Sequence, residues 1–255
     1  MSFVEIKGKK IGVGGPKICV SVMGQTEEEI LRQINTLQNN QMIDIVEIRA
    51  DYFQGLGRPD EVERLMTAVQ SRLSEKIVLF TIRSEKEGGQ SLPSDITDID
   101  KINRLVISSK LADIVDIELS DGASSKRELV ELAHANAVKI IMSYHNFDTT
   151  PELEFMTGKL EDMKNMGADI IKIAVMPKTI HDVYRLMEAA SYTKERLNVP
   201  LVAISMGAFG AITRISGALY GSDITFGALE RASAPGQIPV ADLKRMMDDI
   251  ERYCV

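Results

Sequence analysis

A lysine inside an apolar run is the residue of this chain with the clearest chemical potential. Lys172 lies in DIIKIAV (169–175), a run of aliphatic residues typical of a strand that is covered on both faces. Burial favours the neutral amine over the ammonium, and a neutral amine attacks ketones to form a Schiff base. The alternatives are a lysine that extends its amine from a strand end, or one that pairs with a carboxylate such as Glu118 or Glu47.

A histidine and a glutamate could supply the proton transfers that imine chemistry needs. His145 ends the run VKIIMSYH (138–145) and is one of only three histidines. Its imidazole suits proton transfer at carbon and oxygen, although a hydrogen-bonded structural histidine is the alternative. Glu87 lies in the loop RSEKEGG, either as a solvated carboxylate or as the partner that fixes the tautomer of His145.

Three arginines, Arg49, Arg83 and Arg214, contrast with the acidic composition of the chain. The sequence has 30 basic and 37 acidic side chains, a formal net charge of −7. A local positive cavity in a negative protein predicts an anionic substrate. Arg214, in AITRISGALYG, fits a surface position equally well. Glu47 shares a strand face with Arg49, either as its ion-pair partner or as a second ligand for a hydroxylated ring.

Several classes of function are disfavoured by the composition. The acidic balance and 5% aromatic residues argue against a nucleic-acid surface. Cys19 and Cys254 lack CxxC spacing, and the charged N-terminus does not resemble a signal peptide, so a reduced, cytoplasmic protein is predicted. The apolar runs are far shorter than the about 20 residues that span a bilayer, so no membrane segment is predicted. Metal-ligand spacings and nucleotide-binding motifs are missing, so no metal or cofactor is predicted.

Eight apolar runs, most of them followed by a helical pattern, must position these side chains. They cover residues 17–22, 44–51, 77–83, 113–119, 138–145, 169–175, 200–206 and 224–229. This alternation predicts an α/β fold with a parallel sheet, and eight units favour a closed eight-stranded β/α (TIM-type) barrel over an open sheet. The segment VEIKGKKIGVGGPK alternates around Gly8 and predicts an N-terminal β-hairpin that closes the barrel floor. No linker divides the chain, so residues 1–255 are predicted to form one catalytic domain.

The polar residues at the ends of these runs should meet at one end of the barrel. Reactive groups of β/α barrels stand at the C-terminal ends of the strands. The residues that end the eight runs are Ser21, Glu47, Arg49, Asp51, Arg83, Asp116, Glu118, His145, Lys172, Met206 and the region of Phe226.

Taken together, the motifs resemble type I 3-dehydroquinate dehydratase of the shikimate pathway, over nearly the whole chain. The stretches that carry the resemblance are EIRAD (47–51), TIRSEKEGG (81–89), SYHNF (143–147), KIAVMP (172–177), AISMG (203–207) and TRISGALYGSDITFGALERASAPGQI (213–238). The resemblance implies that 3-dehydroquinate is dehydrated to 3-dehydroshikimate by syn elimination through a covalent imine. It also implies a homodimer and chemistry without a metal or an organic cofactor.

The resemblance also assigns roles to single residues. Lys172 matches the Schiff-base lysine, His145 the general acid and base, and Glu87 the carboxylate that orients the histidine. The positions that match substrate-binding residues are Ser21, Glu47, Arg49, Arg83, Met206, Arg214, Phe226, Ser233, Ala234 and Gln237. The loop ASAPGQ (232–237) matches the family's lid. A class I aldolase and a non-catalytic barrel that binds a hydroxylated acid are the alternative functions.

Overall fold

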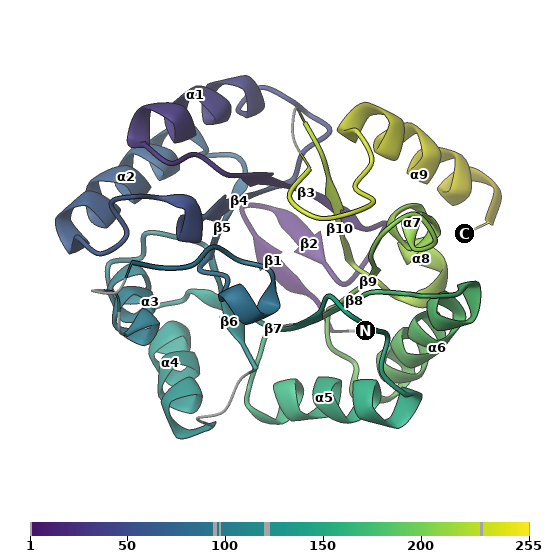
Figure 1. Ribbon diagram of the computed structural model, residues 1–255. Coiled ribbons are helices and arrows are strands. Elements are labelled where there is room, and N and C mark those ends of the chain that lie inside the picture. The colour runs from purple at the N-terminus through teal and green to yellow at the C-terminus, as the bar shows by residue number, and fades with distance from the viewer. Residues whose placement is uncertain (1, 94–95, 97, 120–122, 230–231, 255) are drawn as a thin grey trace.

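The computed structural model describes residues 2–93, 96, 98–119, 123–229 and 232–254. Within them, eight parallel strands form one sheet in the order β10-β3-β4-β5-β6-β7-β8-β9. The two end strands, β9 and β10, are in contact, so the sheet closes, and helices encircle it (Figure 1). The predicted β/α barrel is therefore confirmed.

The barrel strands coincide with the eight apolar runs. They are β3 Lys17–Val22, β4 Ile45–Arg49, β5 Ile77–Thr81, β6 Ile114–Glu118, β7 Lys139–Asn146, β8 Ile170–Val175, β9 Leu201–Ser205 and β10 Ile224–Gly227. Boundaries differ from the predicted ones by one or two residues. After β4, for example, Ala50–Tyr52 turns into the short 3-10 helix η1, because this segment carries the chain from the strand into the loop above the barrel.

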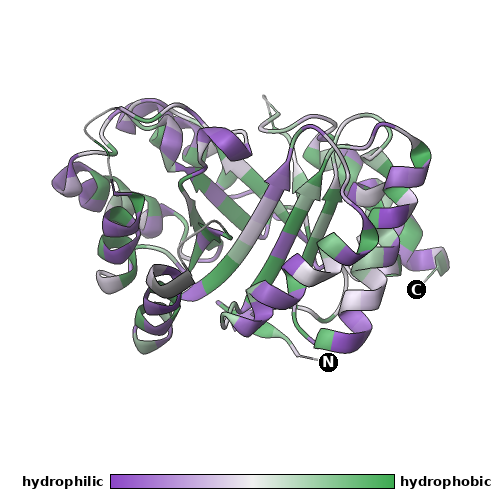
Figure 2. Ribbon diagram, turned by 60° about the horizontal axis from the view of Figure 1, so that its bottom comes forward, coloured by the Kyte–Doolittle hydropathy of each residue, from purple (hydrophilic) through white to green (hydrophobic). Residues whose placement is uncertain are grey.

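The helices cover the outer face of the barrel. They are α1 Glu27–Leu37, α2 Pro59–Arg72, α3 Ile99–Ser108, α4 Ala123–Ala135, α5 Leu153–Asn165, α6 Ile180–Leu197, α7 Ala211–Ile215, α8 Gly217–Tyr220 and α9 Val240–Cys254. Figure 2 shows apolar strands between helices whose polar faces point outward. In α1 the apolar face, Ile30, Ile34 and Leu37, is fully buried, and Thr26 caps the helix. None of the described helices is long and apolar enough to cross a membrane.

An antiparallel hairpin lies across the N-terminal end of the barrel. It consists of β1 Val4–Ile6 and β2 Lys9–Ile11. Lys7 and Gly8 form its turn with φ values of 50° and 74°, and two positive φ angles are what a tight two-residue hairpin needs. The inner side chains of the hairpin, Val4 and Ile11, belong to the same apolar cluster as Ile45 of β4. The predicted floor hairpin is confirmed, and Figure 1 shows it inside the ring of helices.

Every second barrel strand begins with an isoleucine that directly follows an aspartate, and these aspartates bind neighbouring strands at the N-terminal rim of the barrel. The four aspartates each accept a backbone N–H from the preceding strand: Asp44 from Ile18 (3.0 Å), Asp113 from Val78 (2.7 Å), Asp169 from Ile140 (2.9 Å) and Asp223 from Leu201 (2.7 Å). Each aspartate also pairs with a lysine, in the same order Lys9, Lys7, Lys139 and Lys194. Each aspartate therefore has a lysine as its counterion, and its bond to the preceding strand holds the starts of two adjacent strands together.

The barrel interior changes character from its floor to its C-terminal end. The isoleucines of the four Asp-Ile pairs form an apolar layer, and the layer above it is Cys19, Leu79, Ile141 and Val202. Because side chains alternate along a strand, the next inward residues lie two positions beyond the isoleucines. They are Glu47, Asp116, Lys172 and Phe226. Where a further apolar layer would complete a packed core, this barrel has an amine, two carboxylates and an aromatic ring.

Candidate active site

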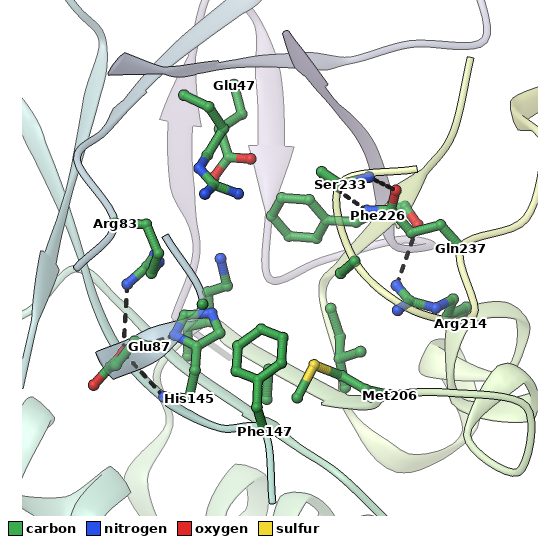
Figure 3. A pocket seen from close by; sticks show the side chains of 16 residues that line it. Glu47, Arg83, Glu87, His145, Phe147, Met206, Arg214, Phe226, Ser233 and Gln237 are labelled. Carbon is green, nitrogen blue, oxygen red and sulfur yellow. Dashed lines mark hydrogen bonds and ion pairs between the residues drawn. The ribbon is translucent and has the colours of Figure 1, made fainter. Parts of the chain in front are cut away.

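A cavity opens above this layer, at the C-terminal ends of the strands (Figure 3). It is lined by Glu47, Arg49, Arg83, Glu87, Gly88, His145, Phe147, Lys172, Ala174, Ile204, Met206, Arg214, Phe226, Ser233, Ala234 and Gln237. The structure thus brings together all predicted site residues except Ser21. The Ser21 hydroxyl lies one step away, hydrogen-bonded to Glu47 and 3.0 Å from the Ser233 hydroxyl.

Lys172 holds its amine inside the barrel. The residue is 4% exposed, so the alternative of an amine that extends into solvent is wrong. Its Nζ lies 3.6 Å from Oδ2 of Asp116 and 4.4 Å from the centre of the Phe226 ring. The carboxylate beside the amine is therefore Asp116, and not Glu118 or Glu47. An amine on an aromatic face with one carboxylate neighbour has a direction from which a substrate carbonyl can approach.

His145, on the neighbouring strand β7, is paired with Glu87. The imidazole Nδ1 lies 2.8 Å from Oε2 of Glu87, and the same oxygen accepts the backbone N–H of His145 at 3.1 Å. An oxygen that accepts both bonds places the ring proton on Nδ1 and leaves the Nε2 lone pair for a reactant. Burial, aided by the charges of Arg83 and Lys172, holds the pKa of His145 well below its usual range, which favours the neutral base.

Glu87 itself sits among charges of both signs. Burial, together with the nearby carboxylate of Glu118, raises the pKa of Glu87 to about 8, although Arg83 opposes this shift. The Glu87 carboxylate is therefore in an environment that favours uptake of a proton near neutral pH. Hydrogen bonding to His145 couples that proton to the imidazole.

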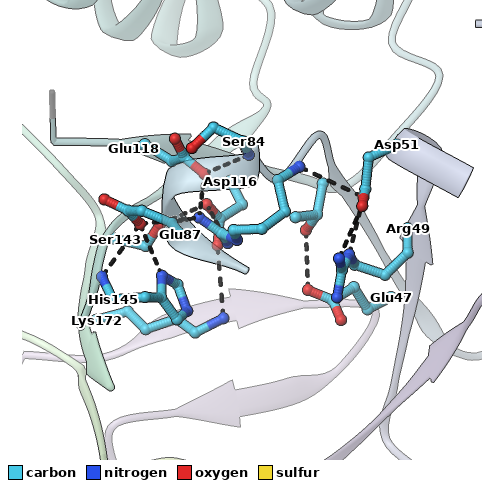
Figure 4. Close-up of polar contacts among 12 residues, drawn as sticks. Glu47, Arg49, Asp51, Ser84, Glu87, Asp116, Glu118, Ser143, His145 and Lys172 are labelled. Atoms are coloured by element: carbon cyan, nitrogen blue, oxygen red, sulfur yellow. Dashed lines mark hydrogen bonds and ion pairs between the residues drawn. The ribbon is translucent and has the colours of Figure 1, made fainter. Parts of the chain in front are cut away.

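Arg83 pairs with the carboxylates of Glu87, Asp116 and Glu118, which Figure 4 shows close together. Its Nη2 lies 2.9 Å from Oδ1 of Asp116, and its Nη1 lies 3.0 Å from Glu118 and 2.9 Å from the Ser143 hydroxyl. Burial lowers the pKa of Arg83, but the surrounding carboxylates, Asp116 first, outweigh burial and raise it. Arg83 is thus a permanent cation that fixes the positions of three acidic groups, Glu87 included.

Arg49 and Glu47 have separate partners. Arg49 donates through Nε and Nη2 to the two oxygens of Asp51, at 2.8 and 2.7 Å. Glu47 accepts hydrogen bonds from the hydroxyls of Thr81, at 2.9 Å, and Ser21. The Glu47–Arg49 ion pair considered from the sequence is not present among the described contacts, so both heads remain directed toward the cavity that they line.

Arg214 is a buried cation without a carboxylate partner among the described residues. It is 1% exposed, so the alternative of a surface position is wrong. Its guanidinium donates to the carbonyl oxygens of Phe226 (3.3 Å) and Pro235 (2.9 Å), while Nε has no partner. Burial lowers the pKa of Arg214 to about 10. A buried guanidinium in this condition is a receptor for an anion.

The loop 232–237 closes over this side of the cavity. The Pro235 carbonyl accepts from Arg214 and from the Gly207 N–H at 3.1 Å, and Gln237 donates to the Ser233 hydroxyl at 2.8 Å. Gly236 has φ of 78°, and a Cβ there would lie 2.4 Å from the Gly207 carbonyl oxygen, so only glycine fits. Residues 230–231 of the predicted motif 213–238 lie outside the described residues.

Asp116 is the site residue to which the sequence alone assigned no role. It was placed at a strand end together with Glu118, and the structure puts it beside the amine of Lys172. The repeated Asp-Ile pair is the signal that finds it, because Asp116 and Lys172 both stand three residues after the aspartate of a pair. Among the described residues, no group of three His, Cys, Asp or Glu side chains is placed to hold a metal ion.

The fold and the site together define a class of protein. A closed β/α barrel with a polar cavity at the C-terminal strand ends is the architecture of TIM-barrel enzymes. The cavity combines a buried amine, a paired imidazole and an unpaired guanidinium, which suits a small anionic carbonyl compound.

The chain belongs to the type I 3-dehydroquinase family, whose model matches residues 18–253. It is 41% identical over 250 residues to a 3-dehydroquinate dehydratase of Clostridium novyi (strain NT), covering 97% of this chain and 98% of that protein. The crystal structure of 3-dehydroquinate dehydratase from Geobacillus kaustophilus HTA426 matches with a TM-score of 0.96 at 33% identity, over 100% of this chain and 98% of the other. The type I enzyme of Clostridium difficile, solved with covalently modified comenic acid, matches with a TM-score of 0.94 at 35% identity, over 98% of both chains.

Proposed function

We propose that this protein is a lyase of the shikimate pathway that dehydrates 3-dehydroquinate to 3-dehydroshikimate through a Schiff base on Lys172. The observation that carries the proposal is the buried Lys172 amine at the base of a cavity that His145 also lines. Membership of the family supports the reaction. The covalently modified ligand in the Clostridium difficile relative is consistent with a nucleophilic side chain in that enzyme.

The chemistry needs one nucleophile and one acid–base group. The Lys172 amine attacks the C3 ketone, and loss of water leaves an iminium on the lysine nitrogen. The iminium withdraws electrons from C2, where His145 removes a proton to give an enamine. The enamine expels the C1 hydroxyl, which takes the proton back from His145 and leaves as water. Hydrolysis of the iminium then releases the enone product and restores Lys172.

The two sides of the cavity bind different groups of the substrate. Arg214, together with Ser233 and Gln237 of the loop above it, binds the substrate carboxylate. Glu47, Arg49 and Arg83 bind the ring hydroxyls, which offer both donors and acceptors. The apolar wall against the ring consists of Met206, Phe226 and Ala234. The buried guanidinium of Arg214 supports this orientation, because no described carboxylate neutralises it.

Intact mass after incubation with 3-dehydroquinate and borohydride, followed by peptide mapping, tests the proposal. The expected result is a single reduced adduct on Lys172, with absorbance of the conjugated enone in samples without reductant. Folded protein that gives neither adduct nor absorbance contradicts the proposal and favours a class I aldolase or a non-catalytic barrel. An adduct with pyruvate or a sugar phosphate in its place would select the aldolase.

Some properties stay predictions from the sequence. They are the homodimer, the cytoplasmic location, the extent of the catalytic domain over residues 1–255 and the independence from nucleic acids. The direct contact of Ser21 with substrate is also a prediction, since its hydroxyl is bonded to Glu47 and Ser233 and lies outside the residues that line the cavity.

A further inference from the structure

We propose that Asp116 is the counterion of the cationic nitrogen that Lys172 carries during catalysis, and that it accepts the N–H of the iminium through Oδ2. This inference rests on the Schiff-base function proposed above. It gives a reacting role to a residue that the family resemblance left without one.

The geometry of Asp116 leaves one oxygen available and holds the other. Oδ1 accepts hydrogen bonds from the Ser143 hydroxyl at 2.6 Å and from Arg83 at 2.9 Å. Oδ2 is fully buried and has no hydrogen-bond partner in the structure. A buried carboxylate oxygen without a donor is costly, and such an atom in a folded protein calls for an explanation. The Lys172 nitrogen lies 3.6 Å away and forms an ion pair with this oxygen.

The other two carboxylates considered for Lys172 form no described ion pair with its amine. The oxygens of Glu47, from β4, accept the hydroxyls of Thr81 and Ser21. Glu118 accepts from Arg83 and from the Ser84 N–H through Oε1, and no described ion pair joins it to Lys172. The remaining groups around the amine are Arg83, two residues after β5, His145 from β7 and the ring of Phe226 from β10. Among the described residues, Asp116 is therefore the one carboxylate that pairs with the Lys172 amine, and its Oδ2 has no hydrogen-bond donor.

The charge balance of imine formation explains why a counterion is useful throughout. A lysine ammonium and a ketone give a protonated iminium and one water molecule, so the nitrogen carries one positive charge before and after the step. The C–N bond forms, the C–O bond breaks, and one N–H remains. That N–H is a single donor in a buried site, and it needs a single acceptor. A carboxylate there keeps the iminium protonated, and the protonated form is the one that withdraws electrons from C2.

Two hydride donors distinguish a counterion from a merely structural residue. Cyanoborohydride reduces the protonated iminium far faster than the neutral imine, whereas borohydride reduces both. The ratio of the two adduct yields on Lys172 does not depend on the fraction of protein that is folded. Asp116→Asn should lower this ratio at least about tenfold, because loss of the charge favours the neutral imine. Loss of both adducts in a variant with parental circular dichroism would contradict the inference, because a counterion acts on the protonation of the imine and not on whether the imine forms.

Glu118→Gln is the matched control. It removes a different carboxylate that pairs with Arg83, through Nη1 and not Nη2, and it leaves the contact between Asp116 and Lys172 intact. Its adduct ratio should stay within about threefold of the parent. Equal changes in both variants would show that Asp116 acts only through Arg83, and an unchanged ratio in Asp116→Asn would also overturn the inference.

The parent protein provides a test that needs no variant. Its adduct ratio should stay constant from neutral pH to about pH 9, since Asp116 keeps the nitrogen protonated. A ratio that falls steeply within this range contradicts the inference while leaving the Schiff-base function standing. Absence of any adduct in the parent would instead refute the proposed function, and the counterion role with it.

Discussion

Histidine, lysine and acidic side chains meet at both ends of the barrel, in surroundings that differ. At the N-terminal rim, Asp169 pairs with Lys139 at 2.9 Å and with His134 at 3.1 Å, and it accepts the Ile140 N–H. The side chains of His134 and Lys139 are 44% and 36% exposed. The aspartate is thus saturated with donors, and its partners are in contact with solvent.

At the C-terminal rim the same chemical groups are buried and less completely paired. The side chains of His145 and Lys172 are 9% and 5% exposed. Oδ2 of Asp116 has no hydrogen bond, and Nε of Arg214 has none. The comparison teaches that residue types alone do not mark a reactive site. Burial with unsatisfied hydrogen-bonding capacity does, because such groups gain most when a ligand arrives.

The lysines give the largest expected contrast. Lys172→Ala should reduce turnover of 3-dehydroquinate to background, since Lys172 is the one lysine among the described residues that line the cavity, while circular dichroism stays parental. Lys139→Ala at the opposite rim should change kcat less than about twofold, because an exposed ion pair contributes little. Enone absorbance measures both. Near-parental activity of the Lys172 variant would refute covalent catalysis.

The histidines should follow the same division with a smaller effect. His145→Ala should lower kcat about 10²–10⁴-fold, because proton transfer at C2 then depends on water, while some borohydride adduct on Lys172 still forms. His134→Ala should leave kcat near the parental value. If the two variants had equal activity, the acid–base assignment of His145 would be wrong.

The pH dependence of stability should also differ between parent and Glu87→Gln. The folded-state pKa of Glu87 is raised to about 8, so the stability that its protonated form provides is lost as the pH rises from its ordinary pKa toward 8. Glutamine keeps the uncharged state at every pH. The unfolding free energy of the variant relative to the parent should therefore rise between pH 5 and pH 8, on the order of 2–4 kcal/mol. Urea denaturation of both proteins at the two pH values measures it, and a flat difference argues against the shifted pKa.

Removal of the unpaired cation should weaken substrate binding. Arg214→Met keeps much of the side-chain volume but removes the charge that faces the substrate carboxylate. KM should rise on the order of 10–100-fold, since a hydrogen bond to a charged group contributes about 1.5–3 kcal/mol. Steady-state kinetics with 3-dehydroquinate measures it. A KM within twofold of the parent would place the carboxylate elsewhere in the cavity.

The smallest effect on catalysis is expected for the aspartates at the N-terminal rim. Asp169→Asn should lower the free energy of unfolding by about 1–3 kcal/mol, because the Ile140 N–H and Lys139 lose a charged acceptor. Its kcat/KM per folded molecule should match the parent. A large loss of activity in this variant would mean that the two rims are coupled, and the contrast between them would fail.

Much of the fold could be predicted from the spacing of apolar residues along the chain, because strand and helix patterns are local. Alternating apolar runs predicted all eight barrel strands, and the turn around Gly8 predicted the hairpin. Strand ends were less predictable, since the tertiary path of each loop decides where pairing stops. The place of Lys172 in a strand could be predicted, but the burial of its amine could not. Neither could the choice of Asp116 as its neighbour, because that contact joins two strands 56 residues apart in sequence.

What the sequence by itself determined is the inventory of reactive groups and their order along the strands, since side-chain alternation is a property of each strand alone. Only the tertiary structure decided which of them are exposed and which are buried. In the folded barrel Arg214 has no described carboxylate partner, and Arg49 pairs with Asp51. Oδ2 of Asp116 lies beside the amine of Lys172 without a hydrogen bond. Those outcomes depend on the register between neighbouring strands around a closed barrel, and closure is a property of all eight strands together.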